Sequence, residues 1–399
     1  MAPGPFELNL RHLRAVSAIV ARGSMSAAAE AVSLSQPALT QGIAKLEQQL
    51  QVLLFERRPD GVSATPEGHL LAERTDAAIA HLGRAARSAG RGFARPELLM
   101  TATQLRAFLA LADAGGFAGA AAAKGLSQPS LHRAVRELEQ LCAYPLVERR
   151  GRGVALTPSG HRLARGVRLA SAEIAAAIAE IVDPEGGGDS IIVGAMPLSR
   201  ASVLPRTIAR FTAEYPKVRI DVVEGSWREL VEPLLDGILD LTIGALRREP
   251  PRGLVQTPLM TDRLVVIGRA GHPLAGAEAP SRDALAAFPW IVGHPGTPLR
   301  GQWGELFAGR DLPEAPIECG SVMVIRQVLR DSDFLTLLSP DQVALEISAG
   351  VLASIGPPLP GSTRTIGITA REGWRPTRAQ ARFLDLLRAA PASGVPEIQ

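Results

Sequence analysis

The chain has 399 residues, a length that predicts about two to four domains rather than one ordinary core. Hydrophobic residues make up 46% of it and charged residues 21%, which is typical of globular proteins and excludes a largely disordered chain. The formal net charge is +3, but the basic excess lies in the part up to Val182, which contains 21 Lys and Arg residues and 15 Asp and Glu residues. That part is therefore the one expected to meet nucleic acid.

The two cysteines, Cys142 and Cys319, are too few for a disulfide framework. Cys142 falls on an apolar helix face, where we expect a structural thiol rather than a redox sensor. No secretory signal opens the chain, and no apolar run approaches the ~18 residues of a membrane span. These features predict a cytoplasmic protein with no membrane partner.

Three helices are predicted at the start of the chain. Residues 10–21 and 26–32 have the apolar spacing of two helices. In residues 34–50, Ser35 suits an N-cap and Pro37 the first turn. The buried face of that third helix steps by four, three and four, through Leu39, Ile43, Leu46 and Leu50. Two helices joined by a tight turn predict a helix-turn-helix.

The opposite face of residues 34–50 carries short polar side chains and one cation, namely Gln36, Thr40, Gln41 and Lys45. Amides and hydroxyls read base edges in the major groove of DNA, and a cation meets phosphate. We therefore expect this face to bind DNA.

Residues 54–65 predict two short strands about a Pro-Asp-Gly turn, and Thr65-Pro66 signals the start of a long helix over 66–89. A basic hairpin beside a recognition helix is a wing, which places Arg57 and Arg58 to hold phosphate. The alternative is that these arginines are only solvated charges. The long helix has a seam suited to helix packing, made of Leu71, Thr75, Ala78, Leu82, Ala85 and Ala89.

The same pattern is repeated 92 residues later in the chain. Leu13–His69 can be laid over Leu105–His161 without a gap, with 26 of 57 positions identical. Because only two copies exist, this is a duplicated module rather than a solenoid. The repeated seam falls on Leu163, Val167, Ala170, Ile174, Ala177 and Ile181.

Glycine-rich segments separate three parts of the chain. Residues 90–96 (GRGFARP) predict a joint between the two copies, and residues 183–189 (DPEGGGD) predict a second boundary. We therefore expect domains at 8–90, 98–183 and 190–390.

Beyond residue 189, predicted strands alternate with predicted helices. The strands are expected at 191–194, 218–223, 240–244, 264–268, 290–292, 317–319, 334–338 and 365–369. The helices are expected at 203–215, 228–238, 299–308, 322–330, 340–349 and 377–387. Alternation of this kind predicts parallel sheets covered by helices, with ligands at the carboxyl ends of strands. We expect two such units, with crossings near 262–268 and 355–365.

The order of a helix, SAAAEAV, LSQPALTQGIAKLEQQL, LFERR, a wing and ATPEG resembles the LysR-type transcriptional regulators. DLTIG within a βα domain resembles their effector domain, so the resemblance covers nearly the whole chain. It implies a winged helix-turn-helix, a linker helix that dimerises, and an α/β two-lobed sensor like a periplasmic binding protein. The doubling departs from the family, whose members normally carry one DNA-binding module per chain.

Position by position, the resemblance implies DNA contacts in the first copy at Ser35, Gln36, Pro37, Thr40, Gln41, Lys45 and Arg57. The matching residues of the second copy are Ser127, Gln128, Pro129, His132, Arg133, Glu137 and Arg149, and Arg136 is a new cation in place of Ala44. Because the two sets differ, the two helices should prefer different half-sites. Residues 141–147 (LCAYPLV) also depart from the family's usual segment before the second wing.

For the sensor, the resemblance places an effector between the two lobes, beside strand ends and helix starts. The candidate residues are Met196, Ser199, Arg200, Ser226, His294, Thr297 and Ser321. Backbone N–H groups at helix starts favour an anion, so we expect a small carboxylate. The alternative is that these residues only cap helices and line turns.

The duplicated seam leaves two arrangements open. In the first, the two long helices pack on each other within one chain, which then presents both halves of a pseudo-palindrome. In the second, each pairs with another chain, so that a dimer holds four winged modules. The residues expected at this packing are Leu71, Leu82, Leu163, Val167, Ile174 and Ile181.

The leading prediction is a ligand-responsive transcription factor with no metal and no cofactor. Its expected partners are double-stranded DNA, a small effector, further copies of itself and RNA polymerase. An enzyme is the unfavoured alternative, because the chain has no P-loop, no HExxH and no nucleophile elbow. A further alternative is an architectural DNA-binding protein whose sensor has lost its ligand.

Overall fold

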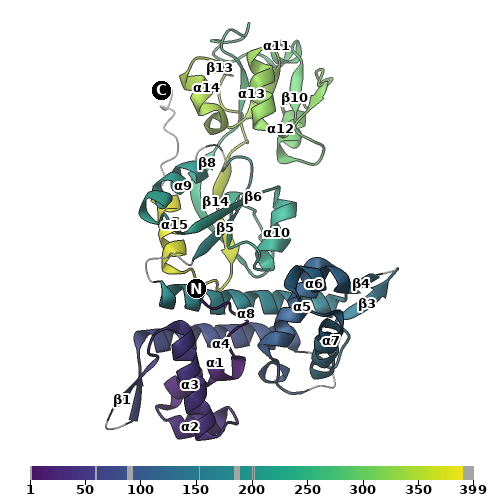
Figure 1. Cartoon of the computed structure of the whole chain (residues 1–399). Coiled ribbons are helices and arrows are strands. Elements are labelled where there is room, and N and C mark those ends of the chain that lie inside the picture. The colour runs from purple at the N-terminus through teal and green to yellow at the C-terminus, as the bar shows by residue number, and fades with distance from the viewer. Residues whose placement is uncertain are drawn as a thin grey trace.

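The computed structural model describes residues 2–58, 61–87, 93–151, 153–183, 189–199, 201 and 203–389. A helical part formed by residues up to 183 lies at one end of the molecule (Figure 1). Two five-stranded sheets follow, one beside the helical part and one at the far end (Figure 1).

The first copy of the repeat forms three helices, a hairpin and a long helix. Its elements are α1 (Leu10–Arg22), α2 (Met25–Ala31), α3 (Gln36–Leu50), β1 (Phe55–Arg58), β2 (Gly61–Ala64) and α4 (Pro66–Ala86). The side chains of Ser24, Ser35 and Thr65 accept hydrogen bonds from backbone N–H groups in the first turns of α2, α3 and α4. Such N-caps explain why each helix begins where it does.

The second copy has the same elements in the same order. After a short 3-10 turn, η1 (Pro96–Leu98), it consists of α5 (Ala102–Ala114), α6 (Phe117–Lys124), α7 (Gln128–Cys142), β3 (Val147–Arg150), β4 (Gly153–Leu156) and α8 (Pro158–Val182). The hairpins share one register, with Phe55 opposite Ala64 in the first and Val147 opposite Leu156 in the second. The departure at residues 141–147 therefore leaves the second hairpin intact.

Residues that are identical in both copies explain why the copies fold alike. Glu47 and Glu139 each accept a hydrogen bond from the backbone N–H seven residues later, both at 2.8 Å. At Gly68 and Gly160, a Cβ would lie 2.2 and 2.1 Å from a carbonyl oxygen of the segment before the hairpin. No side chain fits there, so both copies need glycine at the start of the long helix.

Helices α4 and α8 pack against each other within the chain and run in opposite directions (Figure 1). They approach each other closely at Gly166, where a Cβ would lie 2.3 Å from the Cβ of Ala85. The six residues predicted for this packing are buried in a single apolar core that spans both copies, namely Leu71, Leu82, Leu163, Val167, Ile174 and Ile181. Of the other seam positions in the first copy, Ala85 is only partly buried. Ala89, the last seam position predicted in the first copy, lies outside the described residues.

The sheet beside the helical part has the order β6-β5-β7-β14-β8. Its strands are β5 (Ser190–Ala195), β6 (Arg219–Glu224), β7 (Leu241–Ala245), β8 (Leu254–Asp262) and β14 (Arg364–Arg371). Its helices are α9 (Val203–Glu214), α10 (Trp227–Leu235) and α15 (Arg378–Ala389). We call this unit the proximal lobe.

The second sheet has the order β11-β10-β12-β9-β13 and forms the distal lobe. Its strands are β9 (Val265–Arg269), β10 (Trp290–Val292), β11 (Ile317–Glu318), β12 (Leu335–Leu338) and β13 (Leu352–Ile355). Its helical segments are α11 (Arg282–Ala286), α12 (Pro298–Leu306), α13 (Val322–Arg330), η2 (Pro340–Val343) and α14 (Ala344–Ser348). The chain passes between the sheets at 262–265 and returns at 355–364.

The prediction of parallel sheets holds for β5, β6 and β7 and for β10, β11 and β12, but each sheet also contains antiparallel strands. Strand β14 runs antiparallel to β7 and β8, and β9 runs antiparallel to β12 and β13. These strands adjoin the crossings, and a strand that arrives from the other lobe enters its sheet in the opposite direction. Strands β8 and β13 and helix α11 were not among the predicted elements. Strand β8 is an edge strand of mixed exposure, and its sequence, LVQTPLMTD, has no continuous apolar run.

Candidate DNA-binding faces and interlobe cavity

The polar face of α3 is exposed to solvent. It carries all six residues predicted there, Ser35, Gln36, Pro37, Thr40, Gln41 and Lys45. The opposite face, with Leu39 and Leu46, packs into the core. Ser35 Oγ accepts a hydrogen bond from the N–H of Ala38 at 3.3 Å and caps the helix. The amides and the ammonium group of this face therefore point away from the protein.

Helix α1 fixes the position of α3 through a close contact between His12 and Gly42. A Cβ at Gly42 would lie 2.7 Å from Cδ2 of His12, so the imidazole ring covers this part of α3. Burial lowers the pKa of His12, and the positive charges of Lys45 and Arg11 lower it further. The ring is therefore neutral at pH 7, and Lys45 supplies the positive charge of the adjoining face.

The matching face of α7 is also exposed and carries Ser127, Gln128, Pro129, His132, Arg133 and Arg136. The ring of His132 stacks on Phe117 of α6, with the ring centroids 3.6 Å apart. This contact fixes the imidazole at the outer edge of the helix-turn-helix.

Glu137 takes the place of Lys45 in the second copy and is bound by its neighbours. It accepts hydrogen bonds from Nε2 of Gln104 at 2.8 Å and from Nε of Arg133 at 2.9 Å. Those two hydrogen bonds, the one from Gln104 first, hold the pKa of Glu137 below its ordinary value. The α7 face therefore presents a carboxylate tied to a guanidinium where the α3 face presents an ammonium group.

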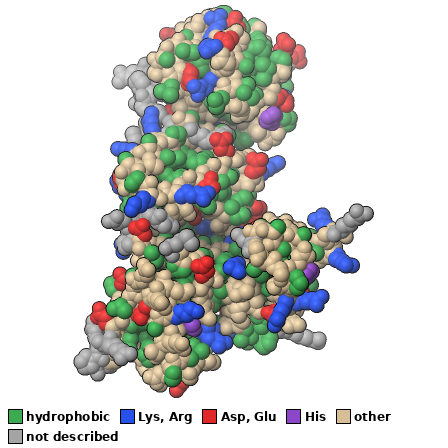
Figure 2. Space-filling view, in the orientation of Figure 1, with side chains coloured by type: hydrophobic (Ala, Val, Ile, Leu, Met, Phe, Trp, Pro, Cys, Tyr) green, Lys and Arg blue, Asp and Glu red, His purple; other side chains and the backbone are tan. Residues whose placement is uncertain are grey.

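The hairpins carry the predicted wing arginines. Arg149 and Arg150 lie in β3 and are exposed. Arg57 and Arg58 lie in β1, and their side chains fall outside the described part of the structure. Figure 2 shows Lys and Arg side chains gathered around the β3–β4 hairpin. The two hairpins point away from each other, at opposite ends of the α4–α8 pair (Figure 1).

A cavity of about 670 Å³ lies between the two lobes. Proximal residues Met196, Ser226 and Trp227 line it together with distal residues His294 and Thr297. A second, more polar hollow of about 1020 Å³ adjoins it and shares His294. The cavity thus lies where strands and helix starts of both lobes meet, which is the usual ligand position in α/β folds.

The predicted effector residues divide into three groups in the structure. Met196, Ser226, His294 and Thr297 line the cavity, and Ser321 lines the adjoining hollow. Ser199 is fully buried, donates to the carbonyl oxygen of Met196 at 2.8 Å and lines neither space. The expectation for Ser199 is therefore wrong, because its hydroxyl closes a turn instead. Arg200 lies outside the described residues.

Two of the lining hydroxyls also have internal partners. Both the N–H and the hydroxyl of Ser226 donate to Glu229, at 2.7 and 2.8 Å, in a capping box. Thr297 Oγ1 donates to the carbonyl oxygen of His294 at 2.7 Å and caps α12. For these two residues the structure favours the capping alternative over direct ligand binding.

Arg247 is a cation in the cavity that was not among the predicted effector residues. Arg247 follows the end of β7, and its guanidinium lies 5.4 Å from the ring centroid of Trp227. Its position at the carboxyl end of a predicted strand was a signal that could have identified it. Arg364 also lines the cavity, but it is paired with Asp262 at 2.6 Å.

No group of three or more His, Cys, Asp and Glu side chains is arranged to hold a metal ion in the described ranges. Within the same ranges, no single helix has the length and hydrophobicity of a membrane span. Helices α5 and α6 have that length and hydrophobicity only when taken together, and a bend of 114° separates them. The apolar face of α5 lies in the helical core.

Family models match both parts of the chain. Residues 184–392 match the model described as the LysR substrate binding domain. Residues 10–69 and 102–161 each match the model described as the bacterial regulatory helix-turn-helix protein, lysR family. The chain belongs to the LysR family of transcriptional regulators.

One relative of this LysR-type regulator is the HTH-type transcriptional regulator GalR of Pseudomonas putida. The two are 32% identical over 384 residues, which span 95% of this chain and 96% of the relative. An alignment of that length includes both copies of the helix-turn-helix.

Two solved structures have a similar fold. Full-length OxyR from Pseudomonas aeruginosa has a TM-score of 0.56 at 22% identity, over 72% of this chain and 94% of that one. Full-length LysG from Corynebacterium glutamicum, solved with bound effector Arg, has a TM-score of 0.55 at 20% identity, over 72% and 96%. At these identities the likeness concerns the fold alone.

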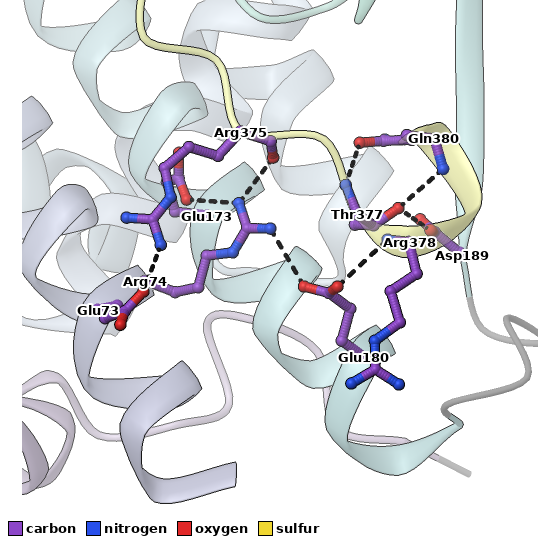
Figure 3. A network of polar contacts seen from close by, with 9 residues as sticks. All are labelled: Glu73, Arg74, Glu173, Glu180, Asp189, Arg375, Thr377, Arg378 and Gln380. Atoms are coloured by element: carbon purple, nitrogen blue, oxygen red, sulfur yellow. Dashed lines mark hydrogen bonds and ion pairs between the residues drawn. The ribbon is translucent and has the colours of Figure 1, made fainter. Parts of the chain in front are cut away.

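The two parts of this LysR-type regulator are joined by a polar network (Figure 3). Arg74 of α4 donates to Glu173 and Glu180 of α8, at 3.0 and 3.1 Å, and to the carbonyl oxygen of Arg375 at 2.8 Å. Arg375 in turn pairs with Glu73 at 3.0 Å. The same guanidinium thus ties the first copy, the second copy and the proximal lobe together.

A second set of contacts fixes the start of α15 at this junction. The N–H of Arg378 donates to Glu180 at 3.2 Å, and Thr377 donates through its hydroxyl to Asp189 (Figure 3). Burial raises the pKa of Asp189, and the hydrogen bond from Thr377 partly offsets that effect. A change in the proximal lobe therefore has direct contacts through which to reach the α4–α8 pair.

Proposed function

We propose that both copies bind DNA as winged helix-turn-helix modules, with α3 and α7 in successive major grooves and the hairpins on phosphate. The exposure of both polar faces supports this proposal. The opposite outcome, burial of the faces that carry Gln36 and Gln128, would have left no route for a duplex.

The observation that carries the proposal is the packing of α4 on α8 within one chain. In this arrangement the two modules lie at opposite ends of one antiparallel helix pair (Figure 1). A single chain then presents two recognition helices with pseudo-two-fold symmetry, as a dimer of one-module chains would. Because the α3 and α7 faces differ in charge and hydrogen bonding, we expect the two half-sites to differ in sequence.

We further infer that the lobes act like those of periplasmic binding proteins and enclose a small anionic effector in the 670 Å³ cavity. Arg247 on the face of Trp227, together with apolar residues such as Met196, supports an effector with an apolar body and a carboxylate. We expect the protein to act in the cytoplasm, to form homo-oligomers and to contact RNA polymerase.

Selection of bound sites from random DNA tests the DNA-binding proposal. The wild type and the variants Gln36→Ala and Gln128→Ala should all select DNA sites that contain two half-sites. Each variant should show a relaxed base preference in the half-site that its altered helix contacts. Lys45→Ala should weaken binding to most sequences about equally and reduce the salt slope by about one. If loss of Gln128 leaves the selected sites unchanged, the second module does not read DNA.

Thermal shift against a panel of small carboxylates tests the effector proposal. A bound effector should stabilise the wild type by RT ln(1 + [L]/Kd), so the gain rises with the logarithm of effector concentration, and Arg247→Gln should weaken the response. If the protein binds its operator but shows no thermal stabilisation by any carboxylate, it is an architectural DNA-binding protein instead.

A further inference from the structure

A cavity of about 300 Å³ lies at the junction between the α4–α8 pair and the proximal lobe. None of its lining residues lines the interlobe cavity, so it is a separate space. Its lining is strongly basic, with six arginines, Arg74, Arg84, Arg165, Arg252, Arg371 and Arg375. Against them stand three carboxyl groups, those of Glu173, Asp240 and Glu372.

Three of these arginines are already neutralised by ion pairs. Arg74 is paired with Glu173 and Glu180. Arg165 is paired with Asp236 at 2.6 Å and with Glu232 at 2.8 Å. The third, Arg375, forms an ion pair with Glu73 at 3.0 Å. Their charges therefore do not require a ligand.

The other three, Arg84, Arg252 and Arg371, have no carboxylate within 4.0 Å among the residues that the structure describes. Nη2 of Arg84 lies 2.9 Å from Nδ1 of His81, and Nη1 of Arg371 donates to the backbone carbonyls of Leu234 and Leu239. Arg371 is only 9% exposed. Asp240 and Glu173 act on Arg371 only from beyond ion-pair distance. A buried guanidinium with no carboxylate in direct contact is unfavourable, so an added anion would be stabilised here.

Asp240 is a carboxyl group whose negative charge acts on Arg371, but burial disfavours its ionised form. Burial raises the pKa of Asp240 to about 6, although Arg371 and a hydrogen bond from the N–H of Ile192 act in the opposite direction. Burial also lowers the pKa of Arg371. Both effects have one physical cause, which is that Asp240 and Arg371 are removed from water.

We propose that this junction cavity binds a phosphate group, either as inorganic phosphate or as the phosphate of a small monoester. Guanidinium groups bind the oxygens of phosphate through paired, charge-assisted hydrogen bonds. Arg84 belongs to α4, Arg252 to the connection before β8, and Arg371 to β14. A phosphate held by all three joins the DNA-binding helix pair to the proximal lobe.

Calorimetric titration of the full-length protein tests this proposal. Inorganic phosphate and glycerol 3-phosphate are titrated in separate runs, with sodium chloride at matched ionic strength as the blank. The site variant is Arg84→Gln with Arg252→Gln, because both side chains are exposed and neither supports the fold as Arg371 does. The matched control is Arg248→Gln, an exposed arginine outside the cavity.

We expect saturable binding of phosphate to the wild type and to the control, and a loss of at least about tenfold in affinity in the site variant. Tighter binding of glycerol 3-phosphate than of inorganic phosphate identifies a phosphorylated metabolite as the ligand, and the reverse order identifies free phosphate. No heat beyond the chloride blank, or equal affinity in all three proteins, overturns the proposal. The titration contains no DNA, so its failure leaves the DNA-binding proposal standing.

Discussion

Arg74 of α4 donates a hydrogen bond to Glu173 of α8 at 3.0 Å, and the two side chains are only 4% and 9% exposed. The pair joins the first copy of the module to the second inside one polypeptide. Glu180, at 3.1 Å, is the second carboxylate on the same guanidinium. The strength of the α4–α8 association can therefore be tested at this one residue.

Replacing Arg74 with Met should lower the free energy of unfolding by about 3–5 kcal/mol, because Glu173 and Glu180 are left buried without a cation. Arg375→Met is the matched control, because it breaks an ion pair with Glu73, whose side chain is 66% exposed. That loss should be about 1 kcal/mol or less. Chemical denaturation measures both, and equal losses would contradict the importance of the buried pair.

Gly166 offers a steric test of the same helix contact. In Gly166→Ala, the new Cβ would lie 2.3 Å from the Cβ of Ala85 and 3.1 Å from the carbonyl oxygen of His81. The helices must separate, which should cost about 1–3 kcal/mol. Gly301→Ala in α12 is the control, because open space surrounds that position, and it should gain up to about 1 kcal/mol. The contact is refuted if both substitutions stabilise the protein.

The differences between the two copies predict a coupled pair of substitutions. Where the first copy has His12 and Gly42, the second has Gln104 and Ala134. Gly42→Ala alone should destabilise the first module, because its Cβ meets the His12 ring at 2.7 Å. In the His12→Gln background the same change should be neutral or stabilise by up to about 1 kcal/mol. A double-mutant cycle measures this coupling, and strictly additive effects would mean that the contact is absent.

Asp240 gives the protein a specific dependence on pH. Its pKa is raised by burial from 3.8 to about 6, so the folded state binds this proton more tightly than the unfolded state does. Stability is therefore lost as the pH rises from about 4 to 6, by up to about 3 kcal/mol. Asp240→Asn removes this loss and keeps an oxygen to accept the N–H of Ile192. Denaturation in phosphate-free buffers should show the variant more stable than the wild type at pH 7 but not at pH 4, and an equal difference at both would contradict the raised pKa.

The sequence alone was sufficient to predict the helical half. Identity between the copies, the caps at Ser35 and Ser127, and the seam through Leu71 and Leu163 are local signals, and each appears in the structure at the expected place. Predictions of this kind succeed because helix periodicity and capping depend on residues only three or four positions apart.

The two-lobed half was predicted less completely, because its features depend on distant contacts. The antiparallel pairing of β14 follows from the return of the chain after more than 90 residues in the other lobe, which no local pattern records. Ser199 failed as an effector ligand because its orientation depends on a turn at Met196. The basic cavity was not foreseen either, since it combines Arg84 with Arg252 and Arg371 from distant elements.

Native mass spectrometry combined with footprinting can show whether one chain supplies both recognition helices of an operator. The operator is a duplex with the two half-sites found by selection, and protein is kept limiting. The smallest complex protecting both half-sites should contain one chain and one duplex. If that complex always contains two chains, a single chain does not supply both recognition helices.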